Sequence, residues 1–331
     1  MKELILLHFV ALILWFIIAP AQAQEKIAIS YSAVAPSVAS LWIPHEEGFF
    51  KKHGLNADLI LIESGSLTSQ ALAAGEIGIA HNAGAPAIIA NASGSGEMII
   101  MGLINGLEYS LVGTTKVKGL EDLKGKRIGV SRIGSSSHAA VAIALDHFKM
   151  DPSRDKITFI QAGTMTTRVG GLRAGSIDAT VVDPSFVPFL TREGFKDLGY
   201  LGEMGIPYQH EVLVSTRSYL KQHRDRALKA VKAVIEGIAF TAQDRNAAEV
   251  KRVLGKYLKF DAGKTEDAYK AVKSYAARDR KPYPTIEGVN ALIQFFARYN
   301  PAVAKITHAS VIDSTLLEEL DKSGFIDALY K

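Results

Sequence analysis

Three consecutive serines, Ser135, Ser136 and Ser137, form the most chemically suggestive motif in this 331-residue chain. They follow Gly134 at the end of an apolar strand and begin an Ala-rich apolar helix. Hydroxyls beside the free N–H groups of a helix N-terminus make a polar cup that can hold an anion or another oxygen-rich group. Serine is also a favoured helix cap, so the same residues can serve the helix alone.

The segments around this motif alternate between strands and helices. The alternation runs through residues 25–104, restarts at Lys126 and continues to about residue 202. This spacing predicts mainly parallel sheets with βαβ crossovers. From about Ser218 onward the chain is almost wholly helical. The sequence therefore predicts an α/β protein with two α/β lobes and a helical C-terminal part.

Each predicted strand-to-helix junction is small and polar. Ligands bind at the carboxyl ends of the strands in an open parallel sheet, so six such junctions predict the two walls of a ligand cleft. The junctions are 30–32, 64–66, 81–84, 134–137, 163–166 and 183–185. The candidate ligand-binding residues in and near them are Ser32, Ser37, Trp42, Ser64, Gly65, Ser66, Thr68, His81, Asn82, Ser135, Ser136, Ser137, Thr164, Thr166 and Asp183.

Several polar and aromatic candidates have a competing structural role. Asp183 precedes a proline and can simply cap the next helix. Trp42 lies on an amphipathic helix, where an aromatic ring usually belongs to the core. His81 has no His or carboxylate partner at metal-ligand spacing, so we expect no metal site. Arg132 and Arg168 are the nearest candidates for a bidentate anion clamp, although a solvated face explains both.

The N-terminus has the layout of a secretory signal peptide. Residues 1–23 contain Lys2, an apolar run over 4–18 and an Ala-Gln-Ala motif that ends at Ala23. An uncleaved anchor is the competing interpretation, but the run is short for a spanning helix. We expect cleavage between Ala23 and Gln24 and a free periplasmic protein, because the chain has no Cys for lipid attachment.

Composition narrows the function classes further. The chain has 38 basic and 34 acidic residues, well interspersed, which suits solubility and makes no nucleic-acid-binding stripe. The absence of Cys excludes disulfides, a thiolate metal site and a Cys nucleophile. No hydrolase elbow, zinc-protease motif, P-loop or dinucleotide fingerprint occurs, which weakens the enzyme interpretation.

Four stretches carry a resemblance to a known family. They are EEGFFKKHGL at 46–55, ALAAGEIGIA at 71–80, GLEDLKGKRIGV at 119–130 and LRAGSIDATVVDP at 172–184. They resemble the SsuA/THI5-like (NMT1-type) periplasmic substrate-binding proteins, the receptors of ABC importers for sulfonates, taurine, nitrate and pyrimidine precursors. The resemblance covers the chain after the leader up to about Phe240.

The resemblance implies a type II periplasmic-binding-protein fold, in which two lobes joined by two crossovers close over a ligand like a hinge. Lobe one would comprise residues 24–113 and 216–331, and lobe two residues 114–215. The C-terminal helices would pack back on lobe one. The expected assembly is a monomer without cofactor that works with a permease of the inner membrane.

The resemblance also implies a function. We expect a receptor that captures a small organic anion, of sulfonate or carboxylate type, and delivers it to an ABC importer without catalysis. One alternative is an enzyme on the same fold, resembling menaquinone-pathway lyases or thiamine-precursor synthases. Those enzymes are intracellular, so the export leader favours transport. A second alternative is a receptor that presents its ligand to a membrane sensor.

Overall fold

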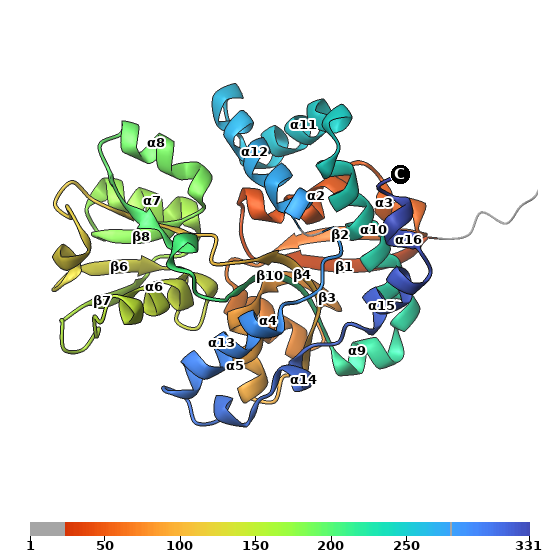
Figure 1. Cartoon of the computed structure of the whole chain (residues 1–331), viewed down its shortest axis with the longest axis horizontal. Helices are drawn as coiled ribbons and strands as arrows, with labels where there is room; N and C mark the ends of the chain where they lie inside the picture. The colour runs from red at the N-terminus through yellow and green to blue at the C-terminus, as the bar shows by residue number, and fades with distance from the viewer. Residues whose placement is uncertain (1–23, 279) are drawn as a thin grey trace, which may run out of the picture.

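The computed structural model describes residues 24–278 and 280–331, and the predicted signal peptide at 1–23 lies outside them. The chain forms two five-stranded mixed sheets, each with helices packed against it. In Figure 1 the second sheet (yellow and green) lies on the left, and the C-terminal helices (teal to blue) lie around the first sheet on the right. The predicted α/β architecture of two lobes with a helical C-terminal part is confirmed.

The first sheet has the strand order β2-β1-β3-β10-β4. Strand β1 pairs in parallel with β2 and β3, whereas β10 is antiparallel to β3 and β4. The three strands β3, β10 and β4 are almost completely buried, as expected for strands covered by helices on both faces. The strands are β1 (Glu25–Tyr31), β2 (Leu55–Leu61), β3 (Ile79–Ala83), β4 (Glu97–Asn105) and β10 (Gln209–Thr216).

The second sheet repeats this plan with the strand order β7-β6-β8-β5-β9. Strand β6 pairs in parallel with β7 and β8, and β5 is antiparallel to β8 and β9. In both sheets one strand that belongs to a crossing between the lobes breaks the parallel pattern. The strands are β5 (Ser110–Gly113), β6 (Arg127–Val130), β7 (Thr158–Gln161), β8 (Ala179–Val182) and β9 (Lys196–Tyr200).

Helices cover both sheets. Those of lobe two, with 3-10 helices labelled η, are η2 (Leu120–Leu123), α6 (Ser136–His147), α7 (Met165–Ala174), η3 (Pro184–Phe186), α8 (Val187–Arg192) and η4 (Leu201–Met204). Those of lobe one are η1 (Pro36–Val38), α2 (Ala39–Glu46), α3 (Phe49–Lys52), α4 (Gly65–Ala73), α5 (Gly84–Ala92), α9 (Arg217–Gln222), α10 (Arg224–Ala242), η5 (Asp244–Asn246), α11 (Ala247–Leu258), α12 (Ala262–Arg278), α13 (Ile286–Ala297), η6 (Val303–Lys305), α14 (His308–Val311), α15 (Thr315–Lys322) and α16 (Phe325–Ala328).

The core of lobe one joins the N-terminal and C-terminal parts of the chain. Side chains of β1 and α2 share one hydrophobic cluster with those of α10, α11, α12 and α15. Helix α10 presents a continuous buried face to α2, and Gly237 lets it approach closely, because a Cβ there would lie 2.6 Å from Pro44 Cδ. The C-terminal helices therefore pack back on lobe one, as the sequence predicted.

The chain passes between the two sheets at residues 106–109 and 201–208. The sequence-based division at 113 and 215 differs from this, because β5 pairs within the second sheet and β10 within the first. Each of these strands reads in the sequence as the end of the preceding lobe. Only their long-range antiparallel pairing assigns them to the next one, which local patterns do not reveal.

The two lobes contact each other on opposite sides of the crossings. Arg298, which directly follows α13, makes two hydrogen bonds of 3.0 Å to the carboxylate of Asp146 in α6. The ring of Phe186 in η3 lies 5.2 Å from that of Phe260, which precedes α12. The lobes are thus closed on one another.

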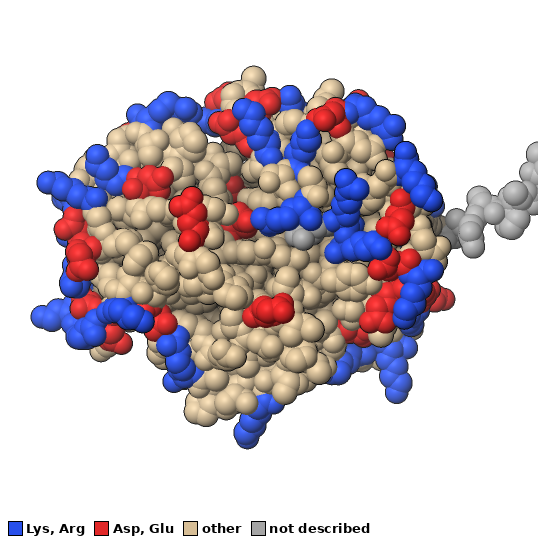
Figure 2. Space-filling view, in the orientation of Figure 1, with Lys and Arg blue, Asp and Glu red and all other residues tan. Residues whose placement is uncertain are grey.

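Lysine and arginine side chains alternate with acidic ones over the face shown in Figure 2, without a continuous basic stripe.

Among the described residues, no helix combines the length and the apolar character that crossing a membrane requires.

Glu97 is a buried carboxyl group in lobe one, at the first position of β4. Its Oε2 accepts a hydrogen bond of 3.2 Å from Ser69 Oγ, while its Oε1 is buried and has no hydrogen-bond partner among the residues that the structure describes. Burial raises the pKa of Glu97 to about 8 from an ordinary value of 4.5. A carboxyl group with this pKa is protonated and neutral near pH 7.

This burial predicts a pH dependence of stability. Between pH 4.5 and about 8 the folded chain keeps a proton on Glu97 that the unfolded chain releases. The contribution of Glu97 to stability is therefore fully present below pH 4.5. It decreases by about 1.4 kcal/mol per pH unit as the pH rises from 4.5 to about 8. Chemical denaturation of the wild type and of Glu97→Gln from pH 5 to 9 measures this loss, which the variant lacks. Parallel pH profiles for the two proteins would contradict the prediction.

Candidate functional site

A small cavity lies between the two lobes, where the carboxyl ends of their parallel strands face each other. Its volume is about 50 Å³. Polar groups from both lobes, from the first crossing and from the start of β10 enclose it. Its walls are formed by Ser32, Ala33, Ala35, Ser37, Glu63, Gly65, Glu108, Tyr109, Ser131, Ser136, Ser137, Thr164, Met165, Arg168, Asp183, His210 and Glu211.

The three serines at the start of α6 have separate tasks. Ser135 is the N-cap, and its buried Oγ accepts from the amide of His138. Ser137 Oγ accepts a 2.8 Å hydrogen bond from the amide of Ser131 and so closes the loop before the helix. Ser136 lies on the cavity wall, where its Oγ is 3.1 Å from the hydroxyl of Tyr109. Ser135 therefore has the capping role, whereas Ser136 and Ser137 lie on the cavity wall, where ligand contact stays a prediction.

Arg168 of α7 is a buried cation on the same wall. Its guanidinium donates to Thr180 Oγ1 at 3.0 Å, to Gly163 O at 2.9 Å and to Val181 O at 3.2 Å. Among the described residues, no carboxylate lies within ion-pair distance of it. Burial lowers the pKa of Arg168 to about 10, so it stays charged near neutral pH. The solvated face that the sequence suggested holds for Arg132, which is exposed, but not for Arg168.

Two further loops of lobe two were predicted to contact ligand. Thr164 lines the cavity and also caps α7, since its Oγ1 accepts from the amide of Thr167 at 3.2 Å. Thr166 is exposed and lies outside the cavity wall. Asp183 lines the cavity, and its Oδ1 accepts from the amide and the hydroxyl of Ser185. Asp183 therefore caps η3 and also lines the cavity. Burial raises its pKa.

Lobe one contributes the loop between β2 and α4. Gly65 lines the cavity, and a Cβ there would lie 2.5 Å from Asn82 Oδ1 and 2.6 Å from Pro86 Cγ. Ser64 precedes it with a φ of 154°, a strained backbone for a residue with a side chain. Its Oγ lies 2.9 Å from that of Ser66. Neither serine belongs to the cavity wall.

Asn82 holds this loop in place from the adjacent strand. Its Nδ2 donates to Gly65 O at 3.1 Å and to Ser69 Oγ at 3.2 Å, and its Oδ1 accepts from the amide of Ala83 at 2.9 Å. The side chain is completely buried and does not line the cavity. The sequence leaves two roles open for Asn82, facing the cleft or bonding the turn, and these hydrogen bonds are those of the second role.

Three other candidates lie behind the cavity wall. Trp42 is completely buried, with its ring stacked at 4.6 Å on that of Tyr257. Thr68 is also completely buried in α4. His81 is buried, with its Nε2 3.2 Å from Ser40 Oγ. Core packing explains the positions of Trp42 and Thr68. His81 does not line the cavity, but its Nδ1 lies 3.5 Å from a carboxylate that does.

That carboxylate belongs to Glu211, which lines the cavity near the start of β10. Its Oε1 lies 3.3 Å from Ser37 Oγ and 3.4 Å from His210 Nε2, and its Oε2 lies 3.5 Å from His81 Nδ1. Burial alone would raise the pKa of Glu211, but His210, His81 and Ser37 outweigh it and hold the pKa below its ordinary value. Burial lowers the pKa of His81. A buried negative charge therefore forms the floor of the cavity.

The first crossing supplies Glu108 and Tyr109. Glu108 accepts hydrogen bonds from the Tyr200 hydroxyl and, at 2.9 Å, from Arg278. Burial, with a smaller contribution from the charge of Glu211, raises the pKa of Tyr109 to about 12, while the hydrogen bond with Ser136 and the charge of Arg168 oppose the rise. The Tyr109 hydroxyl thus lies in the electric field of both buried charges.

The cavity brings together seven of the predicted residues and several that sequence reasoning missed. The predicted ones on the wall are Ser32, Ser37, Gly65, Ser136, Ser137, Thr164 and Asp183. The charged and aromatic residues that were missed are Glu63, Glu108, Tyr109, His210 and Glu211. The missed residues other than Glu63 lie at or beside the crossings, where no strand-to-helix junction marks the sequence.

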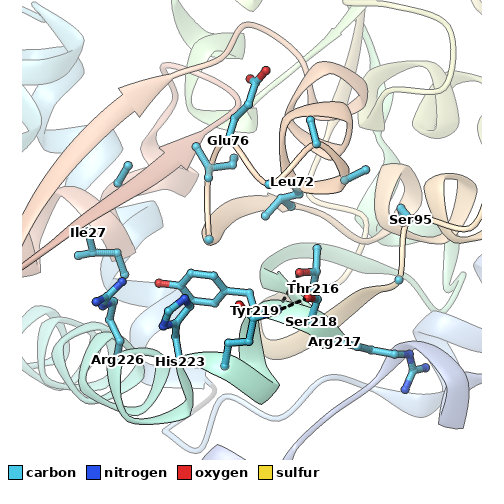
Figure 3. Close-up of a pocket in the computed structure, with 18 of the residues that line it drawn as sticks. Ile27, Leu72, Glu76, Ser95, Thr216, Arg217, Ser218, Tyr219, His223 and Arg226 are labelled. Carbon is cyan, nitrogen blue, oxygen red and sulfur yellow. Dashed lines mark hydrogen bonds between the residues drawn. The ribbon is translucent and has the colours of Figure 1, made fainter.

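A larger hollow, of about 600 Å³, lies at the opposite end of the first sheet (Figure 3). Tyr219, His223 and Arg226 lie on one side of it and Leu72 on the other, while the Glu76 carboxylate points away from them. The guanidinium of Arg226 already has a protein partner, because it donates a hydrogen bond of 3.1 Å to the carboxylate of Glu25, the first residue of β1. The hollow lies at the amino ends of β1 and β3, away from the edge where parallel sheets bind ligands. We therefore place the candidate site in the interlobe cavity.

The described residues contain no group of three or more His, Cys, Asp or Glu side chains that could hold a metal ion.

The close contact of Gly65 predicts the effect of a single methyl group. Gly65→Ala should lower the free energy of unfolding by about 1–3 kcal/mol, because Asn82 and Pro86 are buried and cannot move away freely. The matched control is Gly170→Ala in α7, where an added Cβ meets nothing within 4 Å. That change should raise stability by about 0.5–1 kcal/mol. Chemical denaturation measures both, and equal effects would contradict the packing argument.

Comparison with known proteins agrees with this geometry. The family model described as "NMT1/THI5 like" matches residues 35–248. A putative binding protein of Brucella abortus (strain 2308) is 26% identical over 242 residues, which cover 72% of this chain and 73% of that protein.

Solved structures share the fold at low sequence identity. The alkanesulfonate-binding protein SsuA from Xanthomonas axonopodis pv. citri, bound to MOPS, has a TM-score of 0.71 at 19% identity and covers 87% of this chain and 98% of its own. The periplasmic nitrate-binding protein NrtA from Synechocystis has a TM-score of 0.71 at 15% identity, covering 90% and 89%. The ligand-binding component of an ABC-type import system from Staphylococcus aureus, with zinc bound, has a TM-score of 0.70 at 15% identity, covering 89% and 99%. The chain has the periplasmic-binding-protein fold and belongs to the NMT1/THI5-like family.

Proposed function

We propose that this protein is the extracytoplasmic solute-binding component of an ABC import system. The observation that carries the proposal is a cavity closed between two lobes and lined by buried charged groups from both of them. A buried charge without a protein partner is costly, so such groups are kept where a ligand supplies the partner. Membership of the family and the names of the structural neighbours support the same role.

We further propose that the protein works in the periplasm after export. The sequence of residues 1–23 supports cleavage between Ala23 and Gln24. The first described residue, Gln24, is exposed and directly precedes β1. A cut at this point therefore leaves the whole first sheet intact.

The proposed ligand is small. A cavity of about 50 Å³ holds about three to five water-sized groups, since one water needs about 10–15 Å³ of such volume. Sites for drug-sized ligands are about 300–1,000 Å³. The closed lobes therefore suit a solute of a few non-hydrogen atoms. The lobe boundaries that we propose for this closure are the crossings at 106–109 and 201–208.

The acidic group of the ligand would bind at the lobe-two wall. Ser136 and Ser137 stand at the start of α6, where the first amides of a helix have no intrahelical partner. The partial positive charge of that helix end and the guanidinium of Arg168 both favour an anion. These groups support the expected carboxylate or sulfonate.

Binding without catalysis is the better-supported alternative. The hydroxyl of Ser136 lies beside Tyr109 rather than beside a His that could act as a general base. The closest buried imidazole–carboxylate pairs involve Glu211, on the lobe-one side of the cavity. A product detected by mass spectrometry in stoichiometric excess over protein would support the lyase-like alternative instead.

Ligand binding should stabilise the folded chain. A small carboxylate or sulfonate present at one hundred times its dissociation constant should raise the free energy of unfolding by about 2.7 kcal/mol. A thermal-shift screen of the purified exported protein, followed by titration calorimetry, measures this gain. If no solute of any charge class stabilises the protein, the receptor role is wrong.

The separate tasks of the serines give a matched pair of variants. Ser136→Ala should weaken ligand affinity about tenfold or more, because it removes a donor to a charged group. Ser135→Ala should lower the free energy of unfolding by about 1 kcal/mol and leave the affinity of the folded protein unchanged, because that serine caps α6. Calorimetric titration beside thermal melting distinguishes the two. If Ser136→Ala binds the ligand with wild-type affinity, this serine has a structural role and does not contact the ligand.

A further inference from the structure

An aromatic pair joins the two lobes beside the cavity. Phe186 belongs to η3 of lobe two, and Phe260 lies in lobe one, between α11 and α12. The ring centroids are 5.2 Å apart, and the ring planes are inclined at 69°. Aromatic pairs prefer this edge-to-face arrangement, which is attractive beyond the burial of the two rings. The pair therefore favours the closed arrangement of the lobes.

A lysine makes a second contact between the lobes, four residues after Phe260. The Nζ of Lys264 in α12 lies 4.0 Å from the centroid of the Phe189 ring in α8, within cation–π range. Asp261 holds this ammonium in place, with its Oδ2 3.0 Å from the Nζ. In Figure 1 the helices α8 and α12 both lie above the two sheets. The aromatic and cationic contacts therefore lie together on one side of the molecule.

These half-buried side chains form a cluster that we call the rim clasp: Phe186, Phe189, Phe260 and Lys264. None of the four belongs to the cavity wall. The clasp is nevertheless joined to that wall, because η3 begins directly after Asp183, which lines the cavity. Asp183 Oδ1 accepts a hydrogen bond of 3.0 Å from the amide of Ser185 in η3. A displacement of the clasp therefore moves a wall of the cavity.

Each side of the clasp is fixed to its own lobe. Phe186 and Phe189 pack on a hydrophobic cluster formed mainly by lobe two, and Phe260 packs on the large cluster of lobe one. The lobes are joined by the two crossings, about which they can rotate as rigid bodies. A rotation that opens the cavity on this side separates both contacts at once and exposes the rings to water. The clasp contacts thus belong to the closed form.

The ion pair on the opposite side of the crossings differs from the clasp in its response to salt. The side chains of Arg298 and Asp146 are 49% and 41% exposed. Exposed ion pairs contribute little to stability and are screened by salt. The contact between Phe186 and Phe260 involves no charged group. The clasp is therefore the contact that can hold the lobes together at any ionic strength.

We propose that the rim clasp sets the closed population of this receptor, with Phe260 and Lys264 as positioning residues that act on the ligand without touching it. The inference rests on the proposed function and adds a control of affinity to it. Where only a fraction of the protein is competent to bind, the apparent affinity falls in proportion to that fraction. Loss of the clasp should therefore weaken the binding of every solute by one common factor, whereas loss of a ligand contact changes the affinities unequally.

Small-angle X-ray scattering of the purified exported protein without added solute measures closure directly. Phe260→Ala combined with Lys264→Met removes both contacts and should increase the radius of gyration, because lobe two moves away from lobe one. Phe260→Tyr combined with Lys264→Arg keeps the ring and the cation and should retain the wild-type radius of gyration. Superimposable scattering curves for the wild type and the first variant would show that the clasp does not hold the lobes, and the inference would be wrong.

A matched control removes the same two kinds of contact within lobe one. The rings of Phe49 and Phe240 are 5.6 Å apart at an angle of 67°, and Lys251 Nζ lies 4.8 Å from the centroid of the Tyr269 ring. Phe49→Ala combined with Lys251→Met should lower stability without changing the radius of gyration. An equal expansion in this control would assign the effect to general destabilisation and overturn the inference.

Titration calorimetry with acetate, methanesulfonate and nitrate connects closure to affinity. Each probe that binds the wild type should bind the variant with Phe260→Ala and Lys264→Met up to about tenfold more weakly, by a common factor. Weakening of one probe alone would make the clasp a ligand contact and contradict the inference. If the double variant does not fold, Lys264→Met alone is compared with Lys264→Arg in both measurements.

The outcomes also separate this inference from the receptor role. Expansion of the double variant supports the clasp even if none of the three probes binds. Unchanged scattering together with stabilisation of the protein by a solute rejects the clasp and leaves the receptor role intact.

Discussion

The return of the chain from lobe two into the middle of the first sheet is the constraint on which the site depends. Strand β10 enters between β3 and β4 and pairs antiparallel with both. Its first residues therefore lie at the carboxyl end of parallel β3, with Glu211 paired opposite Ala83. Because a buried carboxylate needs compensation, Ser37 of η1 and His81 of β3 face it. The floor of the cavity, its charge and its second layer of side chains all follow from this one insertion.

Much of the fold could be predicted because local sequence patterns indicate it. Alternating strands and helices predicted two α/β lobes, and small polar junctions predicted which ends of the sheets face a ligand. Ser136 and Thr164 follow from that rule and lie on the cavity wall. Gly65 follows too, although the reason for it is steric, since its Cβ would collide with Asn82. The positions of strand-to-helix junctions therefore locate the edge of the cavity. They do not indicate which side chains at that edge line the cavity.

The remaining parts of the site depend on pairing over long distances in the sequence. Glu211 and His210 lie in a strand that no strand-to-helix junction marks in the sequence, and its pairing beside β3 brings them to the cavity. Arg168 looks like a surface residue on a helix, because nothing local shows that Thr180 and Val181 bury its guanidinium. Trp42 lies in the core, as its place on an amphipathic helix favoured, but the ring that covers it, that of Tyr257, comes more than two hundred residues later. Local chemistry thus identified the hydroxyls, whereas the charges required the tertiary structure.

The position of the two buried charges on different lobes connects binding to closure. With the lobes apart, water can solvate the Arg168 wall and the Glu211 wall separately. Closing the lobes removes that water, and within the described chain Arg168 then keeps Thr180 and backbone carbonyls as partners, while Glu211 keeps Ser37 and the imidazoles of His210 and His81. A ligand with a complementary group for each wall restores the lost interactions only when both lobes contact it. Its differential affinity for the closed form is what shifts the equilibrium, since a ligand that met one lobe alone would bind open and closed forms alike. The same charges that select the solute therefore make its capture a property of the closed state.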